Sequence, residues 1–128
     1  MSLALSRPEF ERLVRKALRQ LPVKFRRFME RENVVVVVAR RPSRRQMLKV
    51  GLNPEVDTLL GLYEGTPRTE RISGYNMAVP DKITIFQEPL EEEYPNPAEL
   101  KEQVRRTVLH EVAHFFGIDD HELRRMGW

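Results

Sequence analysis

The sequence predicts a single globular domain that mixes helices with a few strands. Its 128 residues are enough for one domain with its own core, and hydrophobic residues make up 41% of the chain, too large a share for a disordered segment. Apolar residues follow helical spacing near both ends of the chain and strand patterns in the middle. We therefore expect one domain over residues 1–128.

Composition excludes several classes of function. The chain has no cysteine, which excludes disulfide scaffolds, thiolate zinc fingers and cysteine nucleophiles, so any metal must be held by His, Asp or Glu. Residues 1–10 show no apolar signal segment, and the longest apolar run, residues 34–39, is too short to span a bilayer. The sequence therefore predicts a cytoplasmic protein that does not enter a membrane.

Charge is divided unevenly along the chain. Residues 1–50 carry 14 Lys and Arg against 4 Asp and Glu, whereas residues 51–128 carry 8 against 15. We interpret this as solvated faces of opposite sign on one body. The alternative is a basic surface for nucleic acid, which is less favoured because Arg40, Arg41, Arg44 and Arg45 cluster without aromatic neighbours or a recognisable motif.

Two helices are expected at the N-terminus. Ser6 and Glu9 have the spacing of a capping box, in which the side chains and backbone N–H groups of both residues pair. Apolar residues then recur with helical spacing at Phe10, Leu13, Val14, Ala17, Leu18 and Leu21. Pro22 interrupts this helix, and a second short helix is expected to end before Asn33.

Strand patterns follow in the middle of the chain. The five valines at 34–38 predict a central strand buried on both faces, and residues 82–86 alternate as in a half-buried strand. Residues 51–80 predict a long loop that contains one short strand near 59–63. The acidic run at 91–93 predicts a solvated connection.

A long helix near the C-terminus has clear signals at both ends. Asn96 is a favourable N-cap, Pro97 suits the first helical position, and Glu99 stands at the third. Gly117 supplies the residue that turns left-handed where a helix stops. The helix is expected to run from Pro97 to about Phe116.

This helix contains the pattern HExxH. Because residues four apart lie one above the other on a helix, His110 and His114 can reach one metal ion, and Glu111 lies beside them. A metal held there would polarise a carbonyl and acidify water, and Glu111 would act as general base. All three histidines of the chain fall between positions 110 and 121, which makes a chance match less probable.

A catalytic zinc ion needs a third protein ligand. In the extended pattern HExxHxxGxxH this ligand stands ten residues after the first histidine, which here is Asp120. Asp119 has the position of an N-cap for a short final helix around residues 123–125, which leaves Asp120 free to bind. His121 is the competing ligand, because imidazole binds zinc well and one shift in the turn would bring it closer.

Residues 110–120 resemble the HExxHxxGxxD site of the small bacterial zincin-like metallopeptidases, which are minimal matrix-metalloprotease-like domains. The likeness extends to residues 59–65, 82–86 and 123–128. The resemblance implies an α+β zincin-like fold, with a small mixed sheet packed on N-terminal helices and the HExxH helix. It also implies that zinc (Zn²⁺) is bound by His110, His114 and Asp120 and that peptides or proteins are the substrates.

The first functional hypothesis is therefore a zinc-dependent metalloendopeptidase with Glu111 as general base. Its substrate would lie extended along a sheet edge, and Tyr63 or Tyr75 could stabilise the oxyanion. The alternative hypothesis is a metal-stabilised module that binds protein or nucleic acid with little or no peptidase activity. Replacing Glu111 distinguishes the two, because only the peptidase needs a base.

Overall fold

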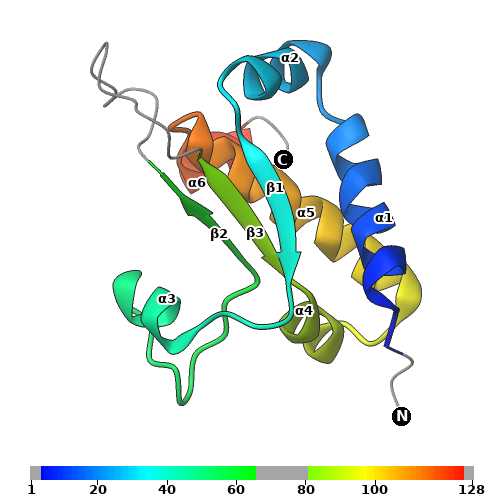
Figure 1. Cartoon of the computed structure of the whole chain (residues 1–128), viewed down its shortest axis with the longest axis vertical. Coiled ribbons are helices and arrows are strands. Elements are labelled where there is room, and N and C mark those ends of the chain that lie inside the picture. Colours follow the sequence, from blue (N-terminus) through cyan, green and yellow to red (C-terminus); the bar gives the residue numbers. More distant parts are fainter. Residues whose placement is uncertain (1–3, 66–80, 126–128) are drawn as a thin grey trace.

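The computed structural model describes residues 4–65 and 81–125, which form an α+β fold around a three-stranded mixed sheet (Figure 1). The predicted strand near 59–63 is present, slightly shifted, and Tyr75 lies outside the described residues. In chain order the elements are α1 (Arg7–Arg19), α2 (Val23–Arg31), β1 (Val35–Ala39), α3 (Arg44–Lys49), β2 (Gly61–Glu64), β3 (Lys82–Phe86), α4 (Gln87–Glu93), α5 (Pro97–Phe115) and α6 (Asp120–Arg125).

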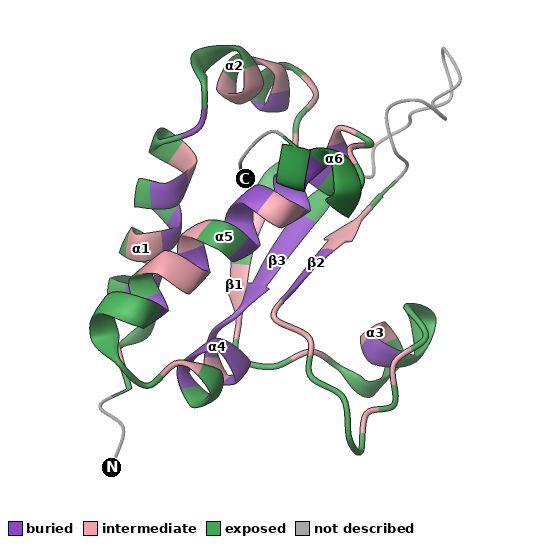
Figure 2. Cartoon of the chain, turned by 180° about the vertical axis from the view of Figure 1, so that it is seen from behind, coloured by how far each residue is buried: buried purple, intermediate pink, exposed green. Residues whose placement is uncertain are grey.

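The two longest helices cover one face of the sheet. Figure 2 shows α5 across this face with α1 beside it. Ile83 and Ile85 of β3 are fully buried in one core cluster with Phe10 of α1 and with Val104 and Val108 of α5. Burying these side chains is the main source of stability, since each contributes about 1.5–3 kcal/mol relative to exposure. The core therefore fixes α5 against the sheet.

The predicted N-terminal helices are confirmed. Ser6 Oγ accepts a hydrogen bond from Glu9 N at 3.2 Å, and Glu9 Oε1 accepts one from Ser6 N at 3.0 Å, which completes the capping box. The second helix, α2, ends at Arg31, and Asn33 follows it with a φ of 58°. Both ends were readable because capping and proline effects are local.

A strand is present at Val35–Ala39, close to the predicted residues 34–38, but the prediction that it is central and buried on both faces was wrong. The strand order is β1-β3-β2, so β1 lies at an edge and β3, paired parallel with β1 and antiparallel with β2, lies in the middle. Val35 and Val37 remain 42% and 37% exposed, whereas β3 is buried on both faces from Ile83 to Phe86 (Figure 2). The prediction that residues 82–86 form a half-buried strand was wrong as well. The polar residue Thr84 suggested a solvent-facing side, but it is only 2% exposed.

The acidic run at 91–93 is helical, which corrects the predicted solvated connection. It forms the end of α4, and Glu91 is buried while its two acidic neighbours are exposed. Glu91 Oε2 accepts hydrogen bonds from Leu5 N at 2.9 Å and from Gln87 Nε2 at 3.3 Å. A carboxylate can be buried when such donors replace water, so this side chain ties the start of the chain to α4.

The basic cluster at residues 40–45 is largely paired within the chain. Arg40 and Arg41 both contact Glu88 of α4, with Arg41 Nε 2.6 Å from Glu88 Oε1. Arg44 Nη1 lies 2.9 Å from Glu55 Oε1. The helix that carries Arg44, α3, was not predicted, although Ser43 and Gln46 form a capping box at its start. These ion pairs support the interpretation of oppositely charged faces over a nucleic-acid surface.

Candidate metal centre

The C-terminal half of α5 carries the predicted site. The helix begins as expected, since Asn96 Oδ1 accepts hydrogen bonds from Ala98 N at 3.0 Å and Glu99 N at 3.2 Å. One side of its last turns is buried against the sheet by Val108, Val112 and Phe115. The opposite side carries His110 and His114, whose side chains are 43% and 44% exposed. The helix therefore presents both imidazoles at the surface on a rigid support.

A tight turn after α5 brings the third predicted ligand back to the helix. Gly117 has a φ of 76°, as predicted for a residue that ends a helix in the left-handed region. Gly117 N donates to His114 O at 3.0 Å and Ile118 N donates to Ala113 O at 2.9 Å, the two bonds of a Schellman motif. Because this motif reverses the chain direction, α6 begins close to the exposed histidines.

Asp119 and Asp120 make different contacts at this turn. Asp119 Oδ1 accepts a hydrogen bond from Glu122 N at 2.8 Å, so Asp119 is the N-cap of α6. Asp120, the first residue of α6, is left with its carboxylate on the histidine side. Its Oδ1 lies 3.6 Å from His110 Nδ1 and 3.9 Å from His114 Nε2. The structure thus brings His110, His114 and Asp120 together.

The distances from Asp120 to the two histidines are close to those between ligands of a zinc ion. Donor atoms bound to one tetrahedral zinc ion lie about 3.3 to 3.6 Å apart, because each bond is about 2.0 to 2.2 Å long. The contacts of Asp120 are at or slightly above that range. Two imidazoles and one carboxylate also form a donor set found in catalytic zinc sites, which keep a fourth position open for water or substrate.

The three side chains are close together but do not form a complete metal-binding site. Across residues 4–65 and 81–125, no group of three or more His, Cys, Asp or Glu side chains has the arrangement of a ready metal site. Of the two ring nitrogens of His114, Nδ1 lies 3.3 Å from Glu111 Oε1 and Nε2 lies 3.9 Å from Asp120 Oδ1.

Glu111 is the buried member of the site. It is 8% exposed, and its contact with His114 raises the pKa of that histidine. Burial of the ring works against the rise, and the negative charges of Glu111 and Asp120 add to it. A carboxylate held beside exposed imidazoles, with few water neighbours of its own, is well placed to exchange a proton with a group bound there.

Gly61 is a site residue that was not singled out from the sequence. It lies in β2 where the strand passes over α5, and a Cβ atom there would be 3.1 Å from Glu111 Cγ and 2.8 Å from Thr107 Cγ2. Glycine is therefore required for the close approach of β2 to Glu111. The signal was present, because an isolated glycine within a predicted strand indicates close backbone approach.

Two other candidates can now be placed. His121 is exposed on α6, and within the described part of the chain no hydrogen bond or ion pair joins it to His110 or His114. Tyr63 lies in β2, where its hydroxyl donates to Asp81 Oδ2 at 3.2 Å and its ring packs on Phe115. Tyr63 therefore has structural contacts of its own.

Comparison with known proteins identifies the class. The family model of zincin-like metallopeptidases matches residues 31–128, which include the whole sheet, α5 and the three candidate ligands. The chain therefore belongs to the zincin-like metallopeptidase family, and its α+β fold agrees with that membership. A search of curated proteins found no match. Among the described helices, none combines the length and the apolar character that crossing a membrane requires.

Proposed function

We propose that this protein is a zinc-dependent metallopeptidase in which His110, His114 and Asp120 hold the metal and Glu111 is the general base. The observation that carries the proposal is the position of Asp120 Oδ1, within 4 Å of a ring nitrogen of each histidine. The family match supports peptide-bond hydrolysis as the reaction class. A zinc ion at these residues would supply a Lewis acid for the scissile carbonyl and lower the pKa of water.

Glu111 moves the protons in this scheme. Its carboxylate takes a proton from the attacking water and returns it to the leaving amine, which is the usual double role of a general base. Burial at 8% exposure limits the water around the carboxylate, and the contact with His114 limits its rotamers. Both effects favour a fixed base, since proton transfer requires hydrogen-bonding distance and alignment.

Asp120 is the proposed third ligand in preference to His121. The N-cap bond of Asp119 fixes the first turn of α6, and that turn sets the direction of Asp120 towards α5. A shift that brought His121 to the same place would break this bond. Carboxylate oxygen is a normal zinc ligand, so the exchange of histidine for aspartate in the extended motif keeps a complete set of three.

The proposed substrate is an extended peptide segment that adds to the outer edge of β2. β2 pairs with β3 on one side, and Gly61 brings this strand against Glu111. An extended peptide pairs with a sheet edge through its own backbone groups. A peptide on this edge would place a peptide bond near the candidate metal centre with limited dependence on sequence.

Replacing the base separates the peptidase from a binding module. We expect Glu111→Gln to abolish cleavage of a peptide library, as monitored by mass spectrometry. The variant should still bind zinc. Glu99→Gln, at the other end of the same helix, is the matched control and should cleave normally. Full cleavage by Glu111→Gln would contradict the mechanism, and zinc binding with no cleavage by the native chain would favour the binding module.

A further inference from the structure

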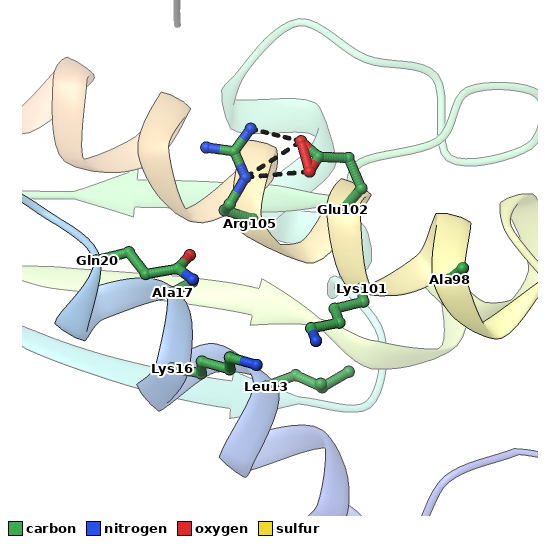
Figure 3. A pocket seen from close by; sticks show the side chains of 8 residues that line it. All are labelled: Leu13, Lys16, Ala17, Gln20, Ala98, Lys101, Glu102 and Arg105. Atoms are coloured by element: carbon green, nitrogen blue, oxygen red, sulfur yellow. Dashed lines mark hydrogen bonds and ion pairs between the residues drawn. The ribbon is translucent and has the colours of Figure 1, made fainter.

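A second concave site lies between α1 and α5, away from the candidate metal centre. It has a volume of about 270 Å³, and Leu13, Ala17 and Ala98 provide apolar side chains around it (Figure 3). The α5 side of the cavity extends from Ala98 to Arg105, and Lys101 stands nine residues before His110. At 1.5 Å per residue this is about 13 Å along the helix axis. The two sites share a helix but no residue.

Two lysines from different helices face each other across this cavity. The side chains of Lys16 in α1 and Lys101 in α5 point towards one another (Figure 3). The ammonium group of Lys101 close by lowers the pKa of Lys16, and desolvation and the positive charge of Arg19 add to the effect. Neither lysine forms an ion pair with a carboxylate in the described ranges 4–65 and 81–125.

The one acidic side chain that lines the cavity is already paired. Both oxygens of Glu102 lie 3.1 Å from Arg105 Nε, and Oε1 also lies 3.6 Å from Arg106 Nε. Its negative charge is therefore balanced by arginines and does not neutralise the lysines. The cavity keeps an excess of positive charge. Because Lys16 and Lys101 are exposed, water screens part of their repulsion, and an anion between the two ammonium groups would relieve the rest.

We propose that this cavity binds a phosphate group through Lys16 and Lys101. Two ammonium groups match the charge of a phosphate dianion, and lysine is a common phosphate ligand. Gln20 also lines the cavity, and its amide gives a further hydrogen-bond donor (Figure 3). The volume lies just below the range of about 300–1,000 Å³ for drug-sized ligands, which favours a small anion over an extended chain.

The test is a titration of the full-length protein with inorganic phosphate at low ionic strength. Binding is monitored through the NMR chemical shifts of the backbone amides. We expect saturable binding with shifts around Lys16 and Lys101, and affinity about tenfold lower in Lys16→Gln and in Lys101→Gln, as loss of one charged hydrogen bond implies. Lys24→Gln, which removes an equal charge from α2, is the control and should bind normally. Thermal unfolding verifies that each variant is folded.

Two further experiments identify the source of the phosphate group and test whether phosphate binds at the metal centre instead. Equal affinity for a nucleoside 5′-monophosphate would assign the site to the phosphate group itself, and tighter binding would assign it to a phosphorylated metabolite. Phosphate binding should persist in His110→Ala. The proposal is overturned if no saturation occurs, if Lys24→Gln weakens binding as much as Lys16→Gln, or if a DNA duplex binds more tightly and displaces phosphate.

Discussion

Gly61 of β2 and Glu111 of α5 lie so close that a methyl group on Gly61 would be 3.1 Å from Glu111 Cγ. The sheet edge and the proposed general base are thus in contact at a position where the strand has no side chain. Because β2 is also the edge proposed to receive the substrate, one short strand would align the peptide and position the base. This relationship connects the fold to the proposed chemistry.

Gly61→Ala should therefore disturb both stability and activity. The new methyl group would lie 2.8 Å from Thr107 Cγ2 as well as against Glu111, so we expect a loss of about 1–3 kcal/mol in the free energy of unfolding, typical of overpacking. Denaturant unfolding measures this change. Cleavage should fall more than stability alone explains, because Glu111 is displaced.

A second substitution tests that explanation. Thr107→Ser removes Cγ2 but keeps the hydroxyl that donates to Gln103 O at 2.7 Å. Added to Gly61→Ala, it should restore part of the lost stability while the contact with Glu111 persists. Equal stability of the single and double variants would mean that the clash with Thr107 is not the cause.

The pairing of Glu88 gives a prediction for pH. A hydrogen bond from Arg40 has the largest effect and lowers the pKa of Glu88 below its ordinary 4.5. Burial opposes this change, and a hydrogen bond from Arg41 adds to it. A carboxyl with a lowered folded-state pKa stabilises the fold above pH 4.5, and this contribution is lost as the pH falls through the lowered pKa.

Glu88→Gln removes this contribution and provides its measurement. The variant should unfold at a lower temperature than the native chain at pH 7, and the difference should shrink as the pH falls below about 4.5. High salt should also reduce it, since the pairs are near the surface. A difference that stayed constant between pH 7 and pH 3 would show that Glu88 acts through packing and not through its charge.

The third ligand can be identified by comparing two neighbouring residues. Asp120→Ala should weaken zinc binding by more than the 10- to 100-fold that typically follows loss of a residue that hydrogen-bonds to a metal ligand. His121→Ala should bind zinc like the native chain, because His121 is exposed and, among the described residues, no hydrogen bond or ion pair joins it to His110 or His114. Competition with a chromophoric chelator measures both affinities. The reverse order would assign the third ligand to His121.

Local signals made the site helix predictable. The N-cap Asn96, the left-handed Gly117 and the N-cap Asp119 each act within a few residues, and all three occur where the sequence predicts them. The position of Asp120 follows from these caps and the ten-residue spacing. The same reasoning found α1 through Ser6 and could have found α3 through Ser43.

Long-range pairing was not predictable in the same way. The valines of β1 are more apolar than β3, yet β3 is central because two separate segments that lie earlier in the chain, β1 and β2, pair with its two edges. Glu91 is buried because its hydrogen-bond donor is Leu5, 86 residues away. No local pattern contains such information. Gly61 combines the two cases. Its place in a strand could be predicted from local sequence, but its contact with Glu111 could not.

The zinc content of the purified native chain tests the central claim most directly. Elemental mass spectrometry, on protein prepared without a chelator or an affinity tag, should find about one zinc ion per chain, the number that one three-ligand site holds. His110→Ala prepared in parallel should lose it, while His121→Ala should keep it. Zinc retained by His110→Ala, or no zinc in the native chain even after zinc is added, would contradict the account.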